Sequence, residues 1–168
     1  TPVISVAQPD LGSDLSLPDS SDVNVVHEQG LLSVANTSET TTGFFTVTSG
    51  DGLTSIKVAG FELLDVNGDF IGSTNINTGE GFLTVSAFDA ATGIATYSYT
   101  LSAAQIHPTA NGNNVLLDSV TLIAVDRDGE STNAMLDIAI VDDVPIAQQQ
   151  TVNLTISPIT TNLTVIVD

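Results

Sequence analysis

Apolar residues in this chain recur at every second position, in short runs that end at glycine, asparagine or aspartate. The runs GFLTVSAF (81–88) and IATYSYTL (94–101) both alternate in this way. A period of two places the apolar side chains on one face of a β-strand, whereas a helix requires a period of 3.6. The pattern predicts one helical turn, at 102–107, and strands at 2–7, 23–28, 43–49, 53–60, 61–65, 70–73, 81–88, 94–101, 114–126, 131–142, 151–157 and 162–168.

The connections between these runs carry the residues of β-turns. Asn67 and Gly68 stand where a two-residue turn requires positive φ, Gly93 ends a longer hairpin loop, and SGDG at 49–52 is typical of a tight turn. Many short strands with almost no helix predict an all-β fold, an immunoglobulin-like β-sandwich of antiparallel strands.

The chain is strongly acidic. Twenty acidic residues face two basic ones, Lys57 and Arg127, which gives a formal net charge of -18. Phosphate and anionic membrane surfaces would be repelled, so we expect no nucleic acid partner and no direct membrane insertion. The 42% hydrophobic content still predicts a folded core, and the absence of cysteine leaves bound divalent cations as the cross-link that suits an acidic chain.

Carboxylates are concentrated at two places in the predicted last hairpin. The loop DRDGES joins strands 114–126 and 131–142 and carries Asp126, Asp128 and Glu130, whereas AIVDDVPIA at 139–147 carries Asp142 and Asp143 at the far end of the second strand. A strand of about a dozen residues separates the two groups by roughly 35 to 40 Å. In a tandem array, the aspartate pair of one module would meet the acidic loop of the next. Together they offer the oxygen ligands that Ca²⁺ prefers, and Pro145 restricts the linker.

The order of these elements resembles a known family. The run TYSYTLSAAQIHPTANGNNVLLDSVTLIAVDRDGESTNAMLDIAIVDDVPIA (96–147) is similar to the second half of the repeated modules in giant bacterial repeats-in-toxin adhesins exported by type I secretion. VNVVHEQGLLS (23–33) and GFFTVTSGDGLTSIKVAGFEL (43–63) resemble the first half, with His27 where the family often has Asp and with the role of Glu28 left open. The resemblance implies a calcium-stiffened extender or scaffold module, with Asp126, Asp128, Glu130, Asp142 and Asp143 as metal ligands.

The resemblance also divides the chain. Residues 22–147 form the immunoglobulin-like module, 1–21 are a linker or first strand, and 148–168 are a closing strand or the start of a following or inserted domain. The segment ISPITTNLTVIVD (156–168) resembles the entry of a von Willebrand factor A domain, in which Asp168 would be the first aspartate of a metal site. A β-strand that completes this sandwich is the alternative.

Other motifs favour structural roles. DVNGD at 65–69 imitates an EF-hand loop, but Ile76 stands at its twelfth position, so a hairpin turn is preferred. The acids Asp10, Asp14, Asp19 and Asp22 fit a solvated linker, with completion of a metal site as the alternative. His27 and His107 are too few and too separated in sequence to indicate a zinc site, and His107 before Pro108 is expected to order a loop.

The chemistry of an enzyme is not indicated. No nucleophile motif accompanies the serines, and paired carboxylates without tryptophan, beside only two tyrosines, do not indicate a glycosidase cleft. We expect a structural module that positions distal ligand-binding domains, is extracellular on a bacterial surface, contacts neighbouring modules of its own chain and is monomeric in isolation. The alternative is a binding module that recognises a sugar or peptide through loops at one end.

Overall fold

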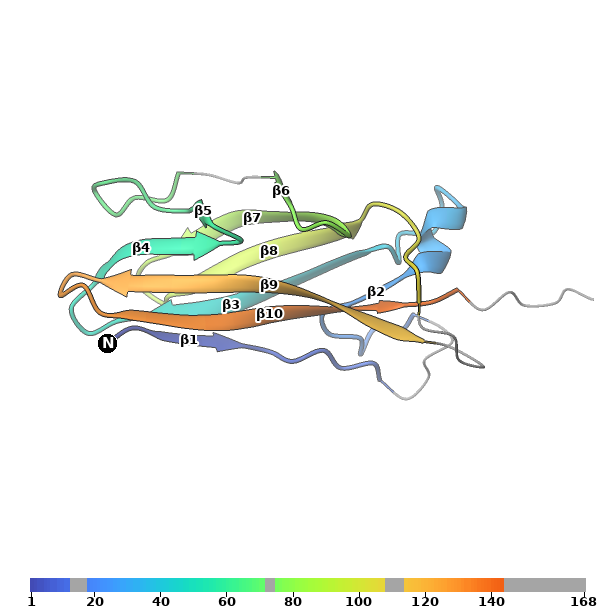
Figure 1. The fold of residues 1–168 in the computed structure, drawn as a ribbon, viewed down its shortest axis with the longest axis horizontal. Coiled ribbons are helices and arrows are strands. Elements are labelled where there is room, and N and C mark those ends of the chain that lie inside the picture. Colours follow the sequence, from blue (N-terminus) through green and yellow to red (C-terminus); the bar gives the residue numbers. More distant parts are fainter. Residues whose placement is uncertain (13–17, 72–74, 108–113, 144–168) are drawn as a thin grey trace, which may run out of the picture.

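The chain folds into two packed five-stranded sheets in a computed structural model that describes residues 1–12, 18–71, 75–107 and 114–143 (Figure 1). The elements are β1 (Val3–Val6), β2 (Val25–His27), the 3-10 helix η1 (Glu28–Leu32), β3 (Thr40–Thr48), β4 (Leu53–Val58), β5 (Phe61–Glu62), β6 (Asn75–Asn77), β7 (Gly81–Asp89), β8 (Ile94–Leu101), β9 (Val115–Asp126) and β10 (Ser131–Val141). The predicted all-β sandwich is confirmed. No helix in the described ranges is long and apolar enough to cross a membrane.

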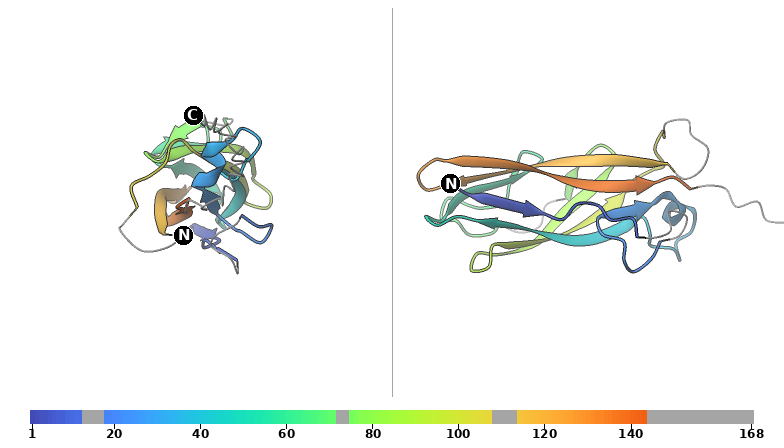
Figure 2. Two further views of the ribbon diagram at one scale, coloured as in Figure 1. Left: turned by 90° about the vertical axis from the view of Figure 1, so that its right-hand side faces the viewer. Right: turned by 90° about the horizontal axis from the view of Figure 1, so that it is seen from below.

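One sheet has the strand order β1-β3-β8-β7-β6 and the other β2-β10-β9-β4-β5. Neighbouring strands are antiparallel, with one exception: β2 runs parallel to β10. The first two strands therefore belong to different sheets, and the second strand covers the edge of β10. The sandwich is elongated along its strands, as Figure 2 shows from below and from one end.

The ends of the sandwich are defined by different segments. The hairpin pole holds Thr1 and the β9–β10 turn (Arg127–Glu130), and the exit pole holds η1 and Asp142, which follows β10 (Figures 1 and 2). The described chain thus begins at one pole, and β10 ends at the other.

The core lies between the inward faces of the two sheets. In β8 the inward positions are Ala95, Tyr97, Tyr99 and Leu101, all at most 1% exposed. The inward row of β9 is Asp118, Val120, Leu122, Ala124 and Asp126, so a buried carboxyl group stands at each end of an apolar row. Period-two alternation buries the apolar side chains and drives the association of the sheets.

Two tyrosine hydroxyls connect the sheets through the core. The Tyr99 hydroxyl donates to Asp118 Oδ2 at 2.7 Å, and Thr78 Oγ1 donates to the same oxygen at 2.5 Å. Tyr97 donates to Asn24 Oδ1, and Asn24 Nδ2 donates to the Ala7 carbonyl at 2.8 Å. These contacts give buried polar groups their partners and fix β8 against β9.

Several details of the predicted elements differ from the structure. The segment 102–107 forms no helical turn; the helical turn is η1, where Leu31 packs on the core. In the predicted strand 70–73, Phe70 makes a single bridge to Leu64, and β6 was not predicted. In the 65–69 turn Gly68 has φ of 85°, but Asn67 does not have positive φ.

This turn is held by the side chain of Asp65 and not by an asparagine with positive φ. Asp65 Oδ1 accepts hydrogen bonds from the backbone N–H groups of Asn67 at 2.8 Å and Asp69 at 2.9 Å. These hydrogen bonds hold the pKa of Asp65 below its ordinary value. The hairpin turn expected for DVNGD is therefore explained by these local hydrogen bonds.

Some sequence predictions lie outside the described residues. They are Asp14, Pro108, Pro145, the strands at 151–157 and 162–168, Asp168, and the assignment of 148–168 to a closing strand or another domain.

Candidate metal centres at the two poles

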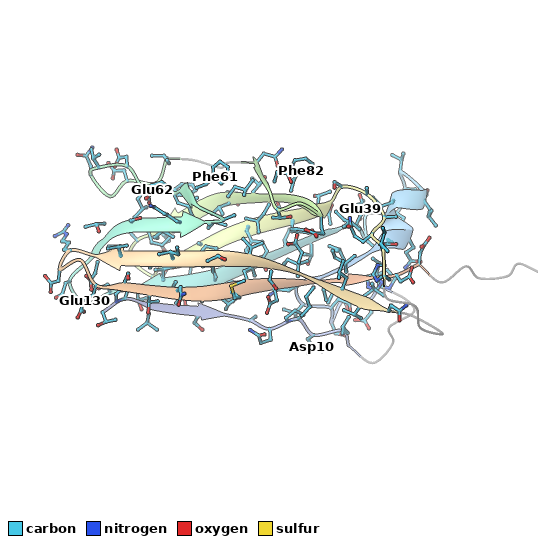
Figure 3. All side chains as sticks on the ribbon, viewed as in Figure 1. Asp10, Glu39, Phe61, Glu62, Phe82 and Glu130 are labelled. Carbon is cyan, nitrogen blue, oxygen red and sulfur yellow. The ribbon has the colours of Figure 1, made fainter. Side chains whose placement is uncertain are left out.

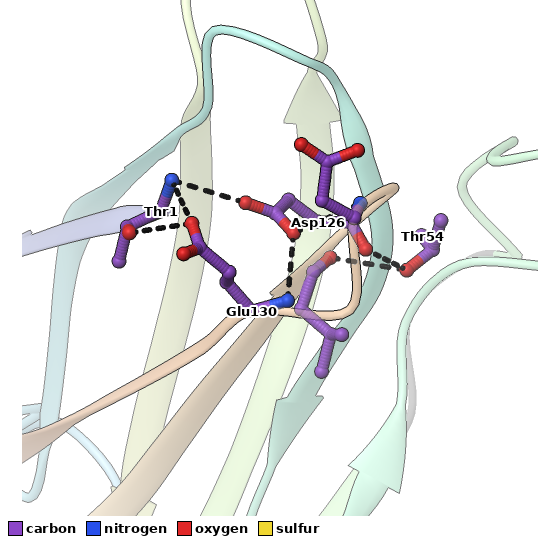
Figure 4. A network of polar contacts seen from close by, with 6 residues as sticks. Thr1, Thr54, Asp126 and Glu130 are labelled. Atoms are coloured by element: carbon purple, nitrogen blue, oxygen red, sulfur yellow. Dashed lines mark hydrogen bonds and ion pairs between the residues drawn. The ribbon is translucent and has the colours of Figure 1, made fainter.

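At the hairpin pole, the acidic turn is organised by the first of its carboxylates. Asp126 Oδ1 accepts hydrogen bonds from the backbone N–H groups of Asp128 at 3.1 Å and Glu130 at 2.9 Å. Asp126 is only 1% exposed because it ends the inward row of β9. Thr54 Oγ1 donates to the Asp126 carbonyl at 3.0 Å and ties the turn to β4 (Figure 4). The turn is therefore rigid on its inner side.

The nitrogen of Thr1 lies between two of these carboxylates. It is 3.2 Å from Asp126 Oδ2 and 2.6 Å from Glu130 Oε2, as Figure 4 shows. The carboxylates of Asp126 and Glu130 therefore converge on one point, whereas Asp128 is exposed and donates its backbone N–H to Asp126 Oδ1.

At the exit pole, strand register brings two acidic residues together. The parallel pairing of β2 with β10 matches Ala139 to Val25 and Val141 to His27. One further step in this register places Asp142 beside Glu28, the first residue of η1. In-register neighbours of parallel strands point to the same face of the sheet. The carboxylates of Glu28 and Asp142 therefore meet, although 114 positions separate them in sequence.

His107 completes this group from a third segment. Its Nε2 lies 2.9 Å from Glu28 Oε1, and the same oxygen accepts the backbone N–H of Gln105 at 2.6 Å. Both side chains of the pair are at most 5% exposed. Among the described residues, Glu28, His107 and Asp142 form the group of acidic and histidine side chains whose ligand atoms all lie within 4.8 Å of one another. We call them the exit-pole triad.

Buried polar atoms without hydrogen-bond partners gather around the exit pole. In the described part of the chain they include His107 Nδ1, Glu39 Oε2 and Asp22 Oδ1. Figure 3 shows Glu39 near η1 and Glu130 at the opposite end. Buried groups of this kind cost about 1–3 kcal/mol each unless water or an ion completes them. The exit pole therefore offers unshared electron pairs to a cation.

The negative charge of the acidic side chains at the exit pole is not neutralised by lysine or arginine. Arg127 lies in the β9–β10 turn and Lys57 pairs with Ile123 and Glu62 within the sheet. The partners of the buried acids here are histidines: His27 Nε2 is 3.1 Å from Asp22 Oδ2, and His107 contacts Glu28. A buried carboxylate is costly without a positive partner, so this pole favours a bound cation.

The five predicted ligands are thus distributed over two different sites. Asp126 and Glu130 converge, and Asp128 lies on the outside of the same turn. Asp142 joins the triad, whereas Asp143 is half-buried and outside it. The sequence argument left the role of Glu28 open and assigned His107 to the ordering of a loop, so it did not identify either as a ligand. The available signal for Glu28 was a glutamate directly after an apolar strand.

The hairpin pole also carries a depression that bears on the binding alternative. Its volume is about 310 Å³, and its lining includes Arg127, Asn67 and Phe88. Among the described residues that line the depression, Phe88 is the one aromatic residue and Arg127 is the one charged residue. Sugar sites usually present several aromatic side chains with converging polar groups, so this lining gives little support to a carbohydrate module.

Comparison with family models, with curated proteins and with solved structures gave no match. The functional argument therefore depends on the residues and their geometry.

Proposed function

We propose that this chain is a structural extender module of a large bacterial cell-surface adhesin, stiffened by Ca²⁺, which holds distal ligand-binding domains away from the cell. The observation that carries the proposal is the placement of buried or converging carboxylates at both poles of an elongated sandwich. β1 starts near one of these poles and β10 ends at the other (Figure 1). The resemblance of residues 22–147 to repeats-in-toxin adhesin modules supports the same function, with secretion by the type I route.

The mechanism depends on charge at the junction between modules. In a tandem arrangement, the exit pole of one module with Asp143 faces the hairpin pole of the next, with Asp126, Asp128 and Glu130. Without a cation these carboxylates repel one another and the junction bends freely. Calcium accepts six to eight oxygens in flexible geometry, which suits a site assembled from two modules. The neighbouring modules of the same adhesin are then the natural partners, and no nucleic acid takes part.

A chain of two tandem copies tests the proposal against the single chain. We expect Ca²⁺ at millimolar concentration, after removal of metal with EDTA, to raise the melting temperature in calorimetry and to extend the tandem chain in small-angle X-ray scattering. Binding to the folded state alone stabilises by about 2.7 kcal/mol at a hundred times the Kd. The double variant Asp126→Asn/Asp128→Asn should lose most of this response.

Asp137→Asn is the matched control because Asp137 lies in the middle of β10, opposite Ser119 and away from both poles. It should respond to calcium as the unaltered chain does. An unchanged melting temperature and unchanged scattering in the tandem chain would refute the spacer function. Glycan-array binding by the single chain would favour the alternative, a binding module.

A further inference from the structure

We propose that the exit-pole triad, Glu28, His107 and Asp142, is a metal site within one module that prefers a divalent transition-metal ion, Zn²⁺ above all, to Ca²⁺. The triad joins three segments: the start of η1, the loop after β8 and the residue after β10. All three ligands belong to one chain, so the inference stands on the fold and does not need the spacer function.

The first argument is convergence. The ligand atoms of the three side chains lie within 4.8 Å of one another. In a tetrahedral zinc site with bonds of about 2.0–2.1 Å, neighbouring ligand atoms are roughly 3.3 Å apart. His107 Nε2 and Glu28 Oε1 are already 2.9 Å apart. Small side-chain movements therefore suffice to close the triad around an ion.

The second argument is an unpartnered nitrogen in a buried ring. His107 Nδ1 is buried and has no hydrogen-bond partner among the described residues. With the ring hydrogen on Nδ1, Nε2 presents its unshared electron pair to Glu28 Oε1 at 2.9 Å, and two acceptors this close require a cation or a proton between them. A histidine that ligates a metal through one ring nitrogen carries its hydrogen on the other, which is Nδ1 here. The contact between Nε2 and Glu28 is therefore the place where an ion would be held.

The third argument is the position of the supporting groups. Gln105 donates its backbone N–H to Glu28 Oε1 at 2.6 Å, which holds that carboxylate in place from the same loop that carries His107. Asp142 donates its backbone N–H to the Asn114 carbonyl at 3.0 Å, which holds this residue directly after β10. Two of the three ligands are therefore positioned by backbone hydrogen bonding and do not depend on the ion for their placement.

The donor set decides which ion is preferred. Imidazole nitrogen suits Zn²⁺, Cu²⁺ and Ni²⁺, whereas Ca²⁺ prefers six to eight oxygen ligands. A group of one nitrogen and two carboxylates, nearly enclosed, offers too few oxygens for calcium. Three protein ligands with one open position match a mononuclear zinc site. A bound ion would join the end of β10 to η1 and the 102–107 loop, and so close the exit pole.

Titration of the metal-free chain, without an affinity tag, tests this site. We expect one equivalent of Zn²⁺ to bind in isothermal titration calorimetry, with little competition from millimolar Ca²⁺. Co²⁺ should give the visible absorption of a tetrahedral site. His107→Gln should weaken zinc binding by more than about 100-fold, the upper range for loss of a supporting residue at a metal site. Glu28→Gln should weaken it in the same direction.

His27→Gln is the matched control. His27 is also buried and also contacts a carboxylate, Asp22, but it is outside the triad. It should bind zinc as the unaltered chain does. Asp126→Asn should also leave zinc binding intact while it reduces the calcium response, which separates this site from the proposed spacer function.

A readout on the unaltered chain guards against variants that fail to fold. The ring ¹⁵N resonances of His107 should shift when one equivalent of Zn²⁺ is added. Zinc binding that leaves these resonances in place, or that survives in a folded His107→Gln chain, would overturn the proposal. Binding of less than one equivalent would show an adventitious ion only and would overturn it equally.

Discussion

The hydrogen bond between Tyr99 and Asp118 offers a quantitative test of how this module is held together without disulfides. The Tyr99 hydroxyl donates to Asp118 Oδ2 at 2.7 Å across the sandwich, and Asp118 is 5% exposed. Burial, followed by the contact with Asp118, raises the pKa of Tyr99, so its hydroxyl remains a donor at every pH at which the fold is studied. Replacing Tyr99 by Phe removes this donor and leaves the ring.

The expected cost follows from the nature of the acceptor. A hydrogen bond to an ionised carboxylate contributes about 1.5–3 kcal/mol, and a bond between neutral groups contributes about 0.5–1.5 kcal/mol. Thr78 still donates to Asp118 after the change. We therefore expect Tyr99→Phe to lower the free energy of unfolding by about 2 kcal/mol. Tyr97→Phe is the matched control because Tyr97 donates to the neutral amide of Asn24, and it should cost about 1 kcal/mol.

Urea unfolding followed by circular dichroism measures both costs, with the slope of the transition unchanged. A double-mutant cycle with Asp118→Asn isolates the pair, and we expect a coupling energy of about 1 kcal/mol or more. Equal costs for the two Tyr→Phe changes, or a coupling energy below about 0.3 kcal/mol, would refute the view that this contact joins the sheets.

A further prediction concerns packing in the core. Gly81→Ala places a Cβ 2.5 Å from the Tyr99 ring and should cost about 1–3 kcal/mol in urea unfolding, whereas Gly50→Ala, with open space at the Cβ position, should stay within about 0.5 kcal/mol; equal costs would contradict the packing argument.

The sandwich was largely predictable because its signal is local. Alternation of apolar and polar residues predicts β8 at 94–101, and the structure has this strand with the same bounds. Gly93 takes the positive φ expected of it. The errors occurred where tertiary contacts outweigh local preference. The segment 102–107 looked helical, but its backbone is used to bond Glu28, and the real helical turn follows β2, where Leu31 finds the core.

The candidate sites were only partly predictable. The acidic turn at Asp126 could be predicted because its residues are close in sequence, and the structure brings the carboxylates of Asp126 and Glu130 together there. Asp142 was predicted as a ligand, but its partners Glu28 and His107 were not. The sequence argument discounted His107 because it stands far from His27 in the chain. Separation along a chain carries no information about separation across a sheet.

Local pattern and composition alone determined that this chain forms strands, that it is strongly acidic and that its carboxylates gather at both ends of the last hairpin. These properties follow from side-chain periodicity and charge, which each residue carries independently of the fold. Only the tertiary structure decided that β2 runs parallel to β10, and this register places Glu28 beside Asp142. The triad depends on that pairing because a shift of one residue would turn the carboxylates to opposite faces of the sheet.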